Sequence, residues 1–163
     1  MSSPAQPAPA AQHTTPIIAV LLLAGLAYAL SQTMVFPALP VIAEHHHAGD
    51  EAASWVLTSF FLSASVATPI FGKLGDLYGK DRVLPVVLAL LCLGSVMCAL
   101  APSIGWVIAG RAVQGVAGGI FPLSFGIIRD TFPPERVAGA IGLLSAVFGV
   151  GGGIGLPMAG ILA

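Results

Sequence analysis

The residue with the clearest chemical potential is Arg111, which lies inside an otherwise uncharged apolar run, Ile104–Ile128. Gln114, Gly115 and Gly118 follow it, and positions 111, 115 and 118 share one face of a helix. Arg111 lies about seven residues into the run, or ~10 Å along a helix. In a membrane, a guanidinium at that depth costs several kcal/mol unless it meets water or acceptors, so Arg111 is a candidate functional group. The alternative is an arginine that extends to the outer interface.

A second polar group lies between two apolar runs, in the segment 72–82. A tight connection between helices needs glycine for its backbone angles, and basic residues anchor such a connection at the cytoplasmic face of a membrane. Asp76 can cap a helix N-terminus or pair with a cation. We therefore expect a short turn between two helices, with candidate residues Gly72, Asp76, Gly79, Lys80 and Arg82.

The composition indicates what surrounds these residues. Hydrophobic residues make up 56% of the 163 residues and charged residues only 8%, whereas soluble domains have about 25% charged residues. The mean hydropathy is +0.95. So few charges cannot solvate a globule of this size, which excludes an ordinary cytosolic enzyme, a disordered chain and a nucleic-acid-binding protein. The sequence predicts an all-α integral membrane protein.

Apolar runs long enough to cross a bilayer, about 20 residues each, divide the chain. We expect five transmembrane helices: Ile17–Pro37, Ala52–Phe71, Val83–Ala101, Ile104–Ile128 and Val137–Ala163. Residues 17–163 would then form one helical bundle, and the Ser-, Pro- and Ala-rich residues 1–16 a disordered tail. Ala27-Tyr28-Ala29 resembles a signal-peptide cleavage site, but the first 16 residues contain no Lys or Arg. We therefore interpret the first run as a retained span.

Orientation follows from the basic residues. The connections Lys73–Arg82 and Arg129–Arg136 carry all five loop cations, and the opposite connections, Ala43–Glu51 and Pro102–Ser103, carry none. The positive-inside rule places the cation-bearing connections, and with them the N-terminus, in the cytoplasm. We expect a multi-pass protein of the plasma membrane.

Several kinds of chemistry have no matching residues. No acidic residue or histidine lies within an expected span, and no phosphate-binding G-x-x-x-x-G-K-(S/T) motif occurs. The two cysteines, at 92 and 98, are not a C-x-x-C pair. His45-His46-His47 could bind a metal, but a loop whose charge changes near pH ~6.5 is the better interpretation. We expect no enzyme activity, no cofactor and no metal site.

Two motifs carry a family resemblance. The segment Gly72-Lys73-Leu74-Gly75-Asp76-Leu77-Tyr78-Gly79-Lys80-Asp81-Arg82 resembles the signature loop of the major facilitator superfamily, G-x-L-(A/G)-D-x-x-G-(R/K)-(R/K). Asp81 departs from it, because the family usually has a base there. Gly110 to Gly119 resembles the superfamily's R-x-x-Q-G-x-x-G motif through Arg111, Gln114, Gly115 and Gly118.

Two partial matches are similar to the fourteen-span drug/proton antiporter branch. In the fifth run Gly152, Pro157 and Gly160 fit G-x-x-x-G-P-x-x-G-G, while Gly149 and Gly153 form a small-residue face for close helix contact. Tight packing without a role in antiport would also explain these glycines. In the first run, Ser31-Gln32-Thr33 replaces the branch's D-x-T, so an acid that could carry a proton is absent there.

The resemblance implies part of the N-terminal six-helix bundle of a transporter of twelve or fourteen spans, whose C-terminal half would complete the substrate site. It implies proton-coupled export of small amphiphilic molecules or drugs across the lipid bilayer. Arg111, Gln114, Gly115, Gln32 and Thr33 would line the cavity, and Asp76 and Arg82 would control the conformational equilibrium. The odd span count suggests a chain cut short. The alternative is a truncated five-span protein that transports nothing and acts by helix association.

Overall fold

The computed structural model describes residues 14–162, with side chains described for residues 16–151 and 153. Within these residues all regular structure is helical, because in a bilayer a helix satisfies its own backbone hydrogen bonds. The elements are α1 (Thr14–Thr33), α2 (Val35–His45), α3 (Asp50–Tyr78), α4 (Lys80–Ala99), α5 (Ile104–Gly115), the 3-10 helix η2 (Val116–Gly119), α6 (Ile120–Thr131) and α7 (Pro134–Leu162). The all-α prediction is confirmed.

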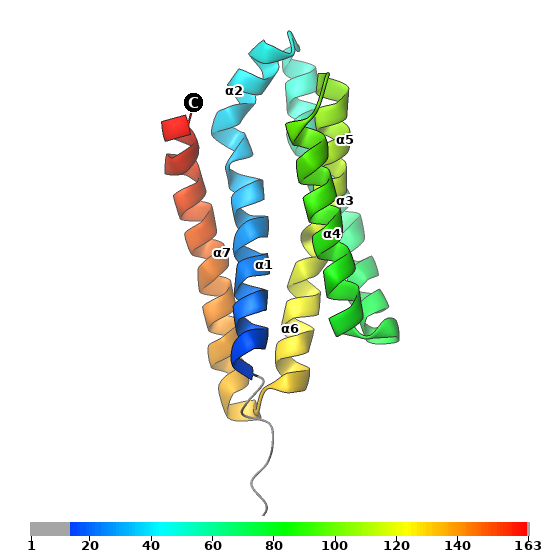
Figure 1. Ribbon diagram of the computed structural model, residues 1–163, viewed down its shortest axis with the longest axis vertical. Helices are drawn as coiled ribbons and strands as arrows, with labels where there is room; N and C mark the ends of the chain where they lie inside the picture. The colour runs from blue at the N-terminus through cyan, green and yellow to red at the C-terminus, as the bar shows by residue number, and fades with distance from the viewer. Residues whose placement is uncertain (1–13, 163) are drawn as a thin grey trace, which may run out of the picture.

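The helices form a bundle in which α1 packs along α7, while α3 and α4 both pack against α5 (Figure 1). Continuing from α5, η2 and α6 contact α3 and α4, and α6 also reaches α1 and α7. The core lies among these helices and is dominated by large side chains that are completely buried, such as Phe60, Ile120, Leu123 and Leu144.

Four helical segments with described side chains are long and apolar enough to cross a membrane: Pro16–Thr33, Asp50–Tyr78, Lys80–Ala99 and Ile104–Thr131. The fifth expected span corresponds to α7, which is 29 residues long. Large apolar side chains are exposed on the outside of the bundle, including Leu23, Leu62, Val66 and Leu93. An outer surface of this kind fits contact with lipid.

Prolines account for two interruptions that the sequence analysis did not anticipate. The first span is divided at Met34, which separates α1 from α2. Pro37 has no N–H to donate to the carbonyl of Thr33, so the helix is weakened at this point. The fourth span contains the 3-10 turn η2, and Pro122 likewise cannot donate to the carbonyl of Gly118.

The expected connections at the basic end are shorter than predicted. Helix α3 continues to Tyr78 and α4 begins at Lys80, so Gly79 alone forms the turn. Its φ of 95° is a conformation that glycine adopts without strain. The connection between α6 and α7 is also shorter than predicted and consists of Phe132 and Pro133. Polar residues that resemble a loop in sequence can extend a helix beyond the bilayer, where water solvates them.

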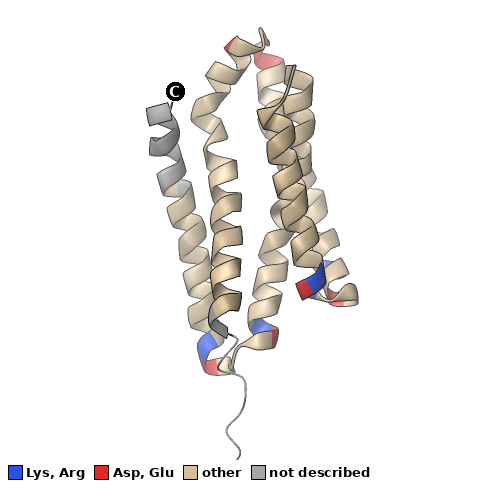
Figure 2. Cartoon of the chain, in the orientation of Figure 1, with Lys and Arg blue, Asp and Glu red and all other residues tan. Residues whose placement is uncertain are grey.

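At the start of the chain, α1 begins at Thr14, so residues 14–16 belong to the helix rather than to the expected tail. Residues 1–13 lie outside the described part of the structure. Figure 2 shows that the Lys and Arg residues other than the buried Arg111 gather at the end of the bundle where α3 meets α4 and α6 meets α7. The opposite end carries Glu44, Asp50 and Glu51. The predicted segregation of the loop cations to one end is therefore confirmed.

Candidate functional site

Arg111 is buried in the bundle, with only 3% of its surface exposed. Its guanidinium carbon lies 4.2 Å from the centre of the Phe60 ring, in a cation–π contact between α5 and α3. A Cβ atom at Gly115 would collide with Ser63 Oγ and the Phe60 carbonyl, so glycine is what lets these helices approach so closely. The arginine is thus held inside the protein and does not extend to the interface.

One nitrogen of the guanidinium joins two helices. Arg111 Nη1 donates hydrogen bonds to the backbone carbonyl of Ser31 in α1, at 3.0 Å, and to Gln114 Oε1, at 2.8 Å. Gln114 Nε2 in turn donates to Ser95 Oγ in α4, at 2.9 Å. Arg111, Gln114, Ser31 and Ser95 form a network, called the Arg111 network below, that connects α1, α4 and α5.

The network leaves part of the arginine without a partner. Arg111 Nε and Nη2 are buried and have no hydrogen-bond acceptor among the described residues. The described residues also provide no carboxylate within ion-pair distance of Arg111. Every acceptor that the guanidinium does have is neutral, so its charge is not balanced within this part of the chain.

A pocket of about 260 Å³ adjoins the Arg111 network. It lies between α2, the end of α1, α4 and α5. Ser31, Arg111 and Gln114 give it a polar side, and Val35, Ile42 and Val107 give it an apolar side. Cys98 and His46 also line it. An apolar pocket with a few convergent polar groups is the usual form of a small-molecule site.

The structure separates the predicted cavity residues into two groups. Arg111 and Gln114 line the pocket, and Gly115 makes the α3–α5 contact described above. Thr33 Oγ1 donates instead to the carbonyl of Ala29, at 2.9 Å, and to that of Gly151 in α7, at 3.3 Å. Gln32 is half-buried and is not a member of the Arg111 network.

An aromatic cluster adjoins the network and was not predicted. Tyr28 lies 5.8 Å from Phe60 and 5.5 Å from Phe121, between ring centres, and Phe121 stacks on Phe148 at 4.0 Å. The four rings come from α1, α3, α6 and α7. The sequence offers no signal for this cluster, because each ring belongs to a different apolar run. Ser95 and Cys98 were not predicted either, because they lie in a different apolar run from Arg111.

The charged residues of the signature segment form a second site, at the basic end. Lys80 Nζ lies 3.1 Å from an oxygen of Asp76 and 2.8 Å from one of Asp130, and so connects α3, α4 and α6. These three residues are called the Lys80 cluster below. A Cβ atom at Gly72 would lie 3.4 Å from Pro122 Cβ in α6. Arg82, which we predicted to act with Asp76, is exposed and makes no ion pair within the described part of the chain.

The expected packing face of α7 is only partly described. A Cβ atom at Gly149 or Gly153 would meet nothing within 4 Å, whereas one at Gly151 would lie 2.7 Å from Ala29 Cβ. The close contact between α1 and α7 is therefore made at Gly151, and close packing at Gly149 and Gly153 stays a prediction. The surroundings of Gly152, Pro157 and Gly160 lie outside the described residues.

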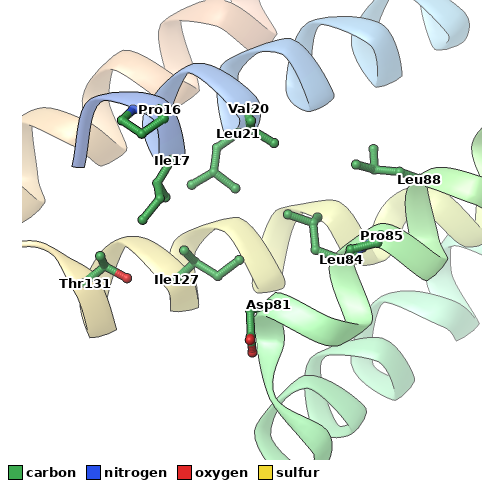
Figure 3. Close-up of a pocket in the computed structure, with 10 residues that line it drawn as sticks. All are labelled: Pro16, Ile17, Val20, Leu21, Asp81, Leu84, Pro85, Leu88, Ile127 and Thr131. Carbon is green, nitrogen blue, oxygen red and sulfur yellow. The ribbon is translucent and has the colours of Figure 1, made fainter. Parts of the chain in front are cut away.

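Another pocket, of about 390 Å³, lies between α1, α4 and α6. Figure 3 shows its lining, in which Ile17, Leu21, Leu84 and Ile127 are apolar and Asp81 marks one edge. The Asp81 carboxylate points away from these apolar side chains (Figure 3). This pocket lacks convergent polar groups that could orient a ligand, so the pocket beside Arg111 is the better candidate site.

At the opposite end of the bundle, the rings of His45 and His46 lie 5.0 Å apart in an edge-to-face arrangement. Within the described residues, no three His, Cys, Asp or Glu side chains are grouped as metal ligands would be.

Comparison with known proteins identifies the family. The model of the Major Facilitator Superfamily matches residues 21–163. The chain is 36% identical over 155 residues to multidrug resistance protein 3 of Bacillus subtilis, covering 94% of this chain and 30% of that protein. It is 35% identical over 145 residues to the efflux pump dotC of Dothistroma septosporum, covering 88% of this chain and 25% of the pump.

A third relative is an MFS-type transporter of Mycobacterium tuberculosis, 38% identical over 136 residues, which are 82% of this chain and 20% of that protein. The chain thus spans less than a third of the length of each of these relatives. Their names are those of transporters and efflux pumps rather than enzymes. The match over residues 21–163, together with the multi-pass helical bundle, shows that the chain belongs to the major facilitator superfamily.

Proposed function

We propose that this chain forms part of a secondary transporter that exports small amphiphilic molecules. The observation that carries this proposal is the buried Arg111 beside a pocket of about 260 Å³, in a chain that matches the superfamily over residues 21–163. Two of the relatives are named as a multidrug resistance protein and an efflux pump, which supports export as the direction.

The rest of the transporter would be supplied by helices that face this bundle. Secondary transporters bind their substrate between two bundles that rock about a shared site. The relatives are more than three times as long as the segment they share with this chain, so they have room for a second bundle. In this arrangement Arg111 and Gln114 contribute one wall of the site.

We propose that transport is coupled to protons. The described spans contain no Asp or Glu away from the bundle ends, so they offer no carboxyl group that could carry a proton through the membrane. The proton-carrying group would then belong to the facing bundle, and Arg111 would lower its proton affinity.

We further propose that the basic end faces the cytoplasm and that the protein lies in the plasma membrane. The collection of loop cations at one end supports this orientation by the positive-inside rule. Cysteines introduced at Gly49 or Ser103, both exposed at the opposite end, should react with an impermeant thiol reagent added to intact cells. A cysteine introduced at the exposed Leu77 should not react, and the reverse pattern would overturn the topology.

Dye efflux from energised cells that produce the full-length protein tests transport directly. One anionic dye, 8-anilinonaphthalene-1-sulfonate, and one cationic dye, ethidium, would be followed by fluorescence. We expect export of at least one dye, loss of export on adding a protonophore, and loss of export in Arg111→Ala. If neither dye nor any other small amphiphile is exported by a protein that reaches the membrane, the proposed function is wrong.

A further inference from the structure

The pocket beside Arg111 has an electrostatic property that the proposed function does not require. Its polar side holds a guanidinium that is 3% exposed, and the polar atoms that this guanidinium contacts are a carbonyl of Ser31 and the amide of Gln114. Neutral acceptors satisfy hydrogen bonds but do not cancel charge. A cation removed from water without a counter-charge strongly favours an anion that enters its surroundings.

The free part of the guanidinium is buried, so it adds to this attraction through its charge rather than by direct contact with the pocket. Nε and Nη2 form one edge of the planar group, and neither has an acceptor among the described residues. The ring of Phe60, 4.2 Å from the guanidinium carbon, supports the plane of the group from one side.

The rest of the pocket suits an apolar body attached to the anionic group. Val35, Ile42 and Val107 line it, and all three belong to an apolar cluster that continues between α2, α3 and α5. The other ionisable side chains in the lining are His46 and Cys98, so the lining contains no carboxylate that would attract a cation. The lining therefore repels cations and offers apolar contact.

We propose that this pocket binds the carboxylate or sulfonate group of an amphiphilic anion, which pairs with Arg111 while its apolar body lies against α2 and α5. This inference rests on the proposed function and narrows its substrate class to acidic amphiphiles. The two proposals can be told apart, because a transporter of amphiphilic cations would satisfy the proposed function but would contradict this inference.

Cys98 provides a reporter inside the pocket. Its sulfur lies 3.6 Å from the Val107 carbonyl and 4.0 Å from Gln114 Oε1, and its side chain is half-buried in the pocket lining. Methanethiosulfonate reagents of similar size carry either a negative sulfonatoethyl group or a positive trimethylammonioethyl group. Their relative rates of reaction at Cys98, each divided by the rate of the neutral methyl reagent, report the sign of the local potential.

The experiment uses the full-length protein in lipid nanodiscs, with modification at Cys98 followed by peptide mass spectrometry. We expect the anionic reagent to react about fivefold or more faster than the cationic one, because a unit charge close by in a low-dielectric pocket changes local ion concentrations by at least that factor. Bound 2-naphthalenesulfonate should slow the reaction, and the 2-naphthylmethylammonium ion should not.

Three variants separate the role of the charge from general effects. Arg111→Gln should abolish both the rate preference and the protection, whereas Arg111→Lys keeps the charge and should keep the preference. Arg82→Gln removes the same charge from an exposed position at the basic end and should change neither. If Arg111→Gln does not fold, the contrast between wild type, Arg111→Lys and Arg82→Gln still tests the sign of the potential.

Three results would overturn the inference. The first is an equal or faster reaction with the cationic reagent. The second is no reaction of Cys98 with either charged reagent. The third is protection by the ammonium probe as strong as that by the sulfonate. None of these results depends on transport, so each is distinguishable from a failure of the proposed function, which dye efflux measures separately.

Discussion

Arg111 and Lys80 are both cations that join three helices, yet their surroundings are opposite. Lys80 lies at the basic end with 22% of its side chain exposed, and its amine contacts two carboxylates, at 2.8 and 3.1 Å. Arg111 is 3% exposed and contacts a carbonyl, an amide oxygen and an aromatic ring. The exposed cation has two counter-charges, and the buried one has none among the described residues.

This difference separates two uses of charge. Exposed ion pairs contribute only about 0–1 kcal/mol each, because water solvates the separated ions nearly as well. The Lys80 cluster can therefore break and re-form at little cost, as a contact that changes between conformations must. An intramembrane arginine costs about 2.5 kcal/mol or more. A residue that costs this much and has no counter-charge is explained better by a ligand than by stability.

The largest effect is expected at Arg111. In the full-length protein, Arg111→Ala should reduce transport about 100-fold or more, because an interaction with a buried charge is worth about 3 kcal/mol or more when one partner is removed. Arg111→Lys should retain folding and surface expression but lose most transport, since lysine lacks the planar fork of donors. Initial rates of dye efflux, corrected for surface protein, measure both effects.

The matching substitution at the other site, Lys80→Ala, should reduce transport only a few-fold. Equal losses at the two positions would remove the distinction between them. If Arg111→Ala transports normally, Arg111 belongs to the scaffold and the site assignment is wrong.

The next largest effect is expected at Gly115, where α3 and α5 approach closely and place the Phe60 ring against Arg111. Gly115→Ala should lower the free energy of unfolding by about 1–3 kcal/mol, the usual cost of overpacking, because the new methyl group collides with backbone of α3. Gly142→Ala is the matched control, since a Cβ atom there meets nothing within 4 Å.

The control should be neutral or more stable by up to ~1 kcal/mol, because alanine favours a helix more than glycine does. Thermal unfolding of the two variants in the same detergent gives the comparison. If the two substitutions have the same effect, the close approach at Gly115 does not hold the α3–α5 contact together.

The smallest effects are expected at the Lys80 cluster. Asp76 is 69% exposed on its side chain, so Asp76→Asn should change the free energy of unfolding by less than about 1 kcal/mol. We expect it to lower the transport rate a few-fold with little change in substrate affinity, because the cluster lies at the end of the bundle, away from the pocket beside Arg111.

Lys73→Gln provides the control for this site, since Lys73 is exposed and makes no ion pair within the described residues. Rates and substrate dissociation constants measured for both variants distinguish the two roles. A large loss of affinity at an unchanged rate in Asp76→Asn would show that the cluster contacts substrate.

The sequence was sufficient for features that depend on nearby residues. The apolar runs predicted the long helices, and the spacing of Arg111, Gly115 and Gly118 predicted that they share one helix face, because a helix repeats every ~3.6 residues. The same reasoning from nearby residues was wrong for residues 72–82, whose polar residues and glycines had predicted a loop. Residues 72–78 instead continue α3, and residues 80–82 begin α4.

Contacts between distant residues could not be predicted in this way. Lys80 and Asp130 are 50 residues apart, and Arg111 and Ser31 are 80 apart. Asp76 and Lys80 have the i,i+4 spacing of an ion pair on one helix, but the spacing does not indicate that Lys80, rather than Arg82, also pairs with Asp130. That choice depends on the turn at Gly79 and on how α4 packs against α6, both of which are set by the whole bundle.

Arg111 has no counter-charge among the described residues, and we infer that it therefore recruits an anion. The substitution Ser31→Asp tests this inference, because Ser31 lines the pocket and its carbonyl already accepts a hydrogen bond from Arg111 Nη1. The measurement is the affinity of the full-length protein for 2-naphthalenesulfonate, from fluorescence anisotropy, with Ser31→Asn as the neutral control of the same shape. We expect Ser31→Asp to weaken binding about tenfold or more, the effect of ~1.4 kcal/mol from a carboxylate that competes for the guanidinium, and Ser31→Asn to bind as the wild type does. Equal affinity in the two variants would contradict the claim.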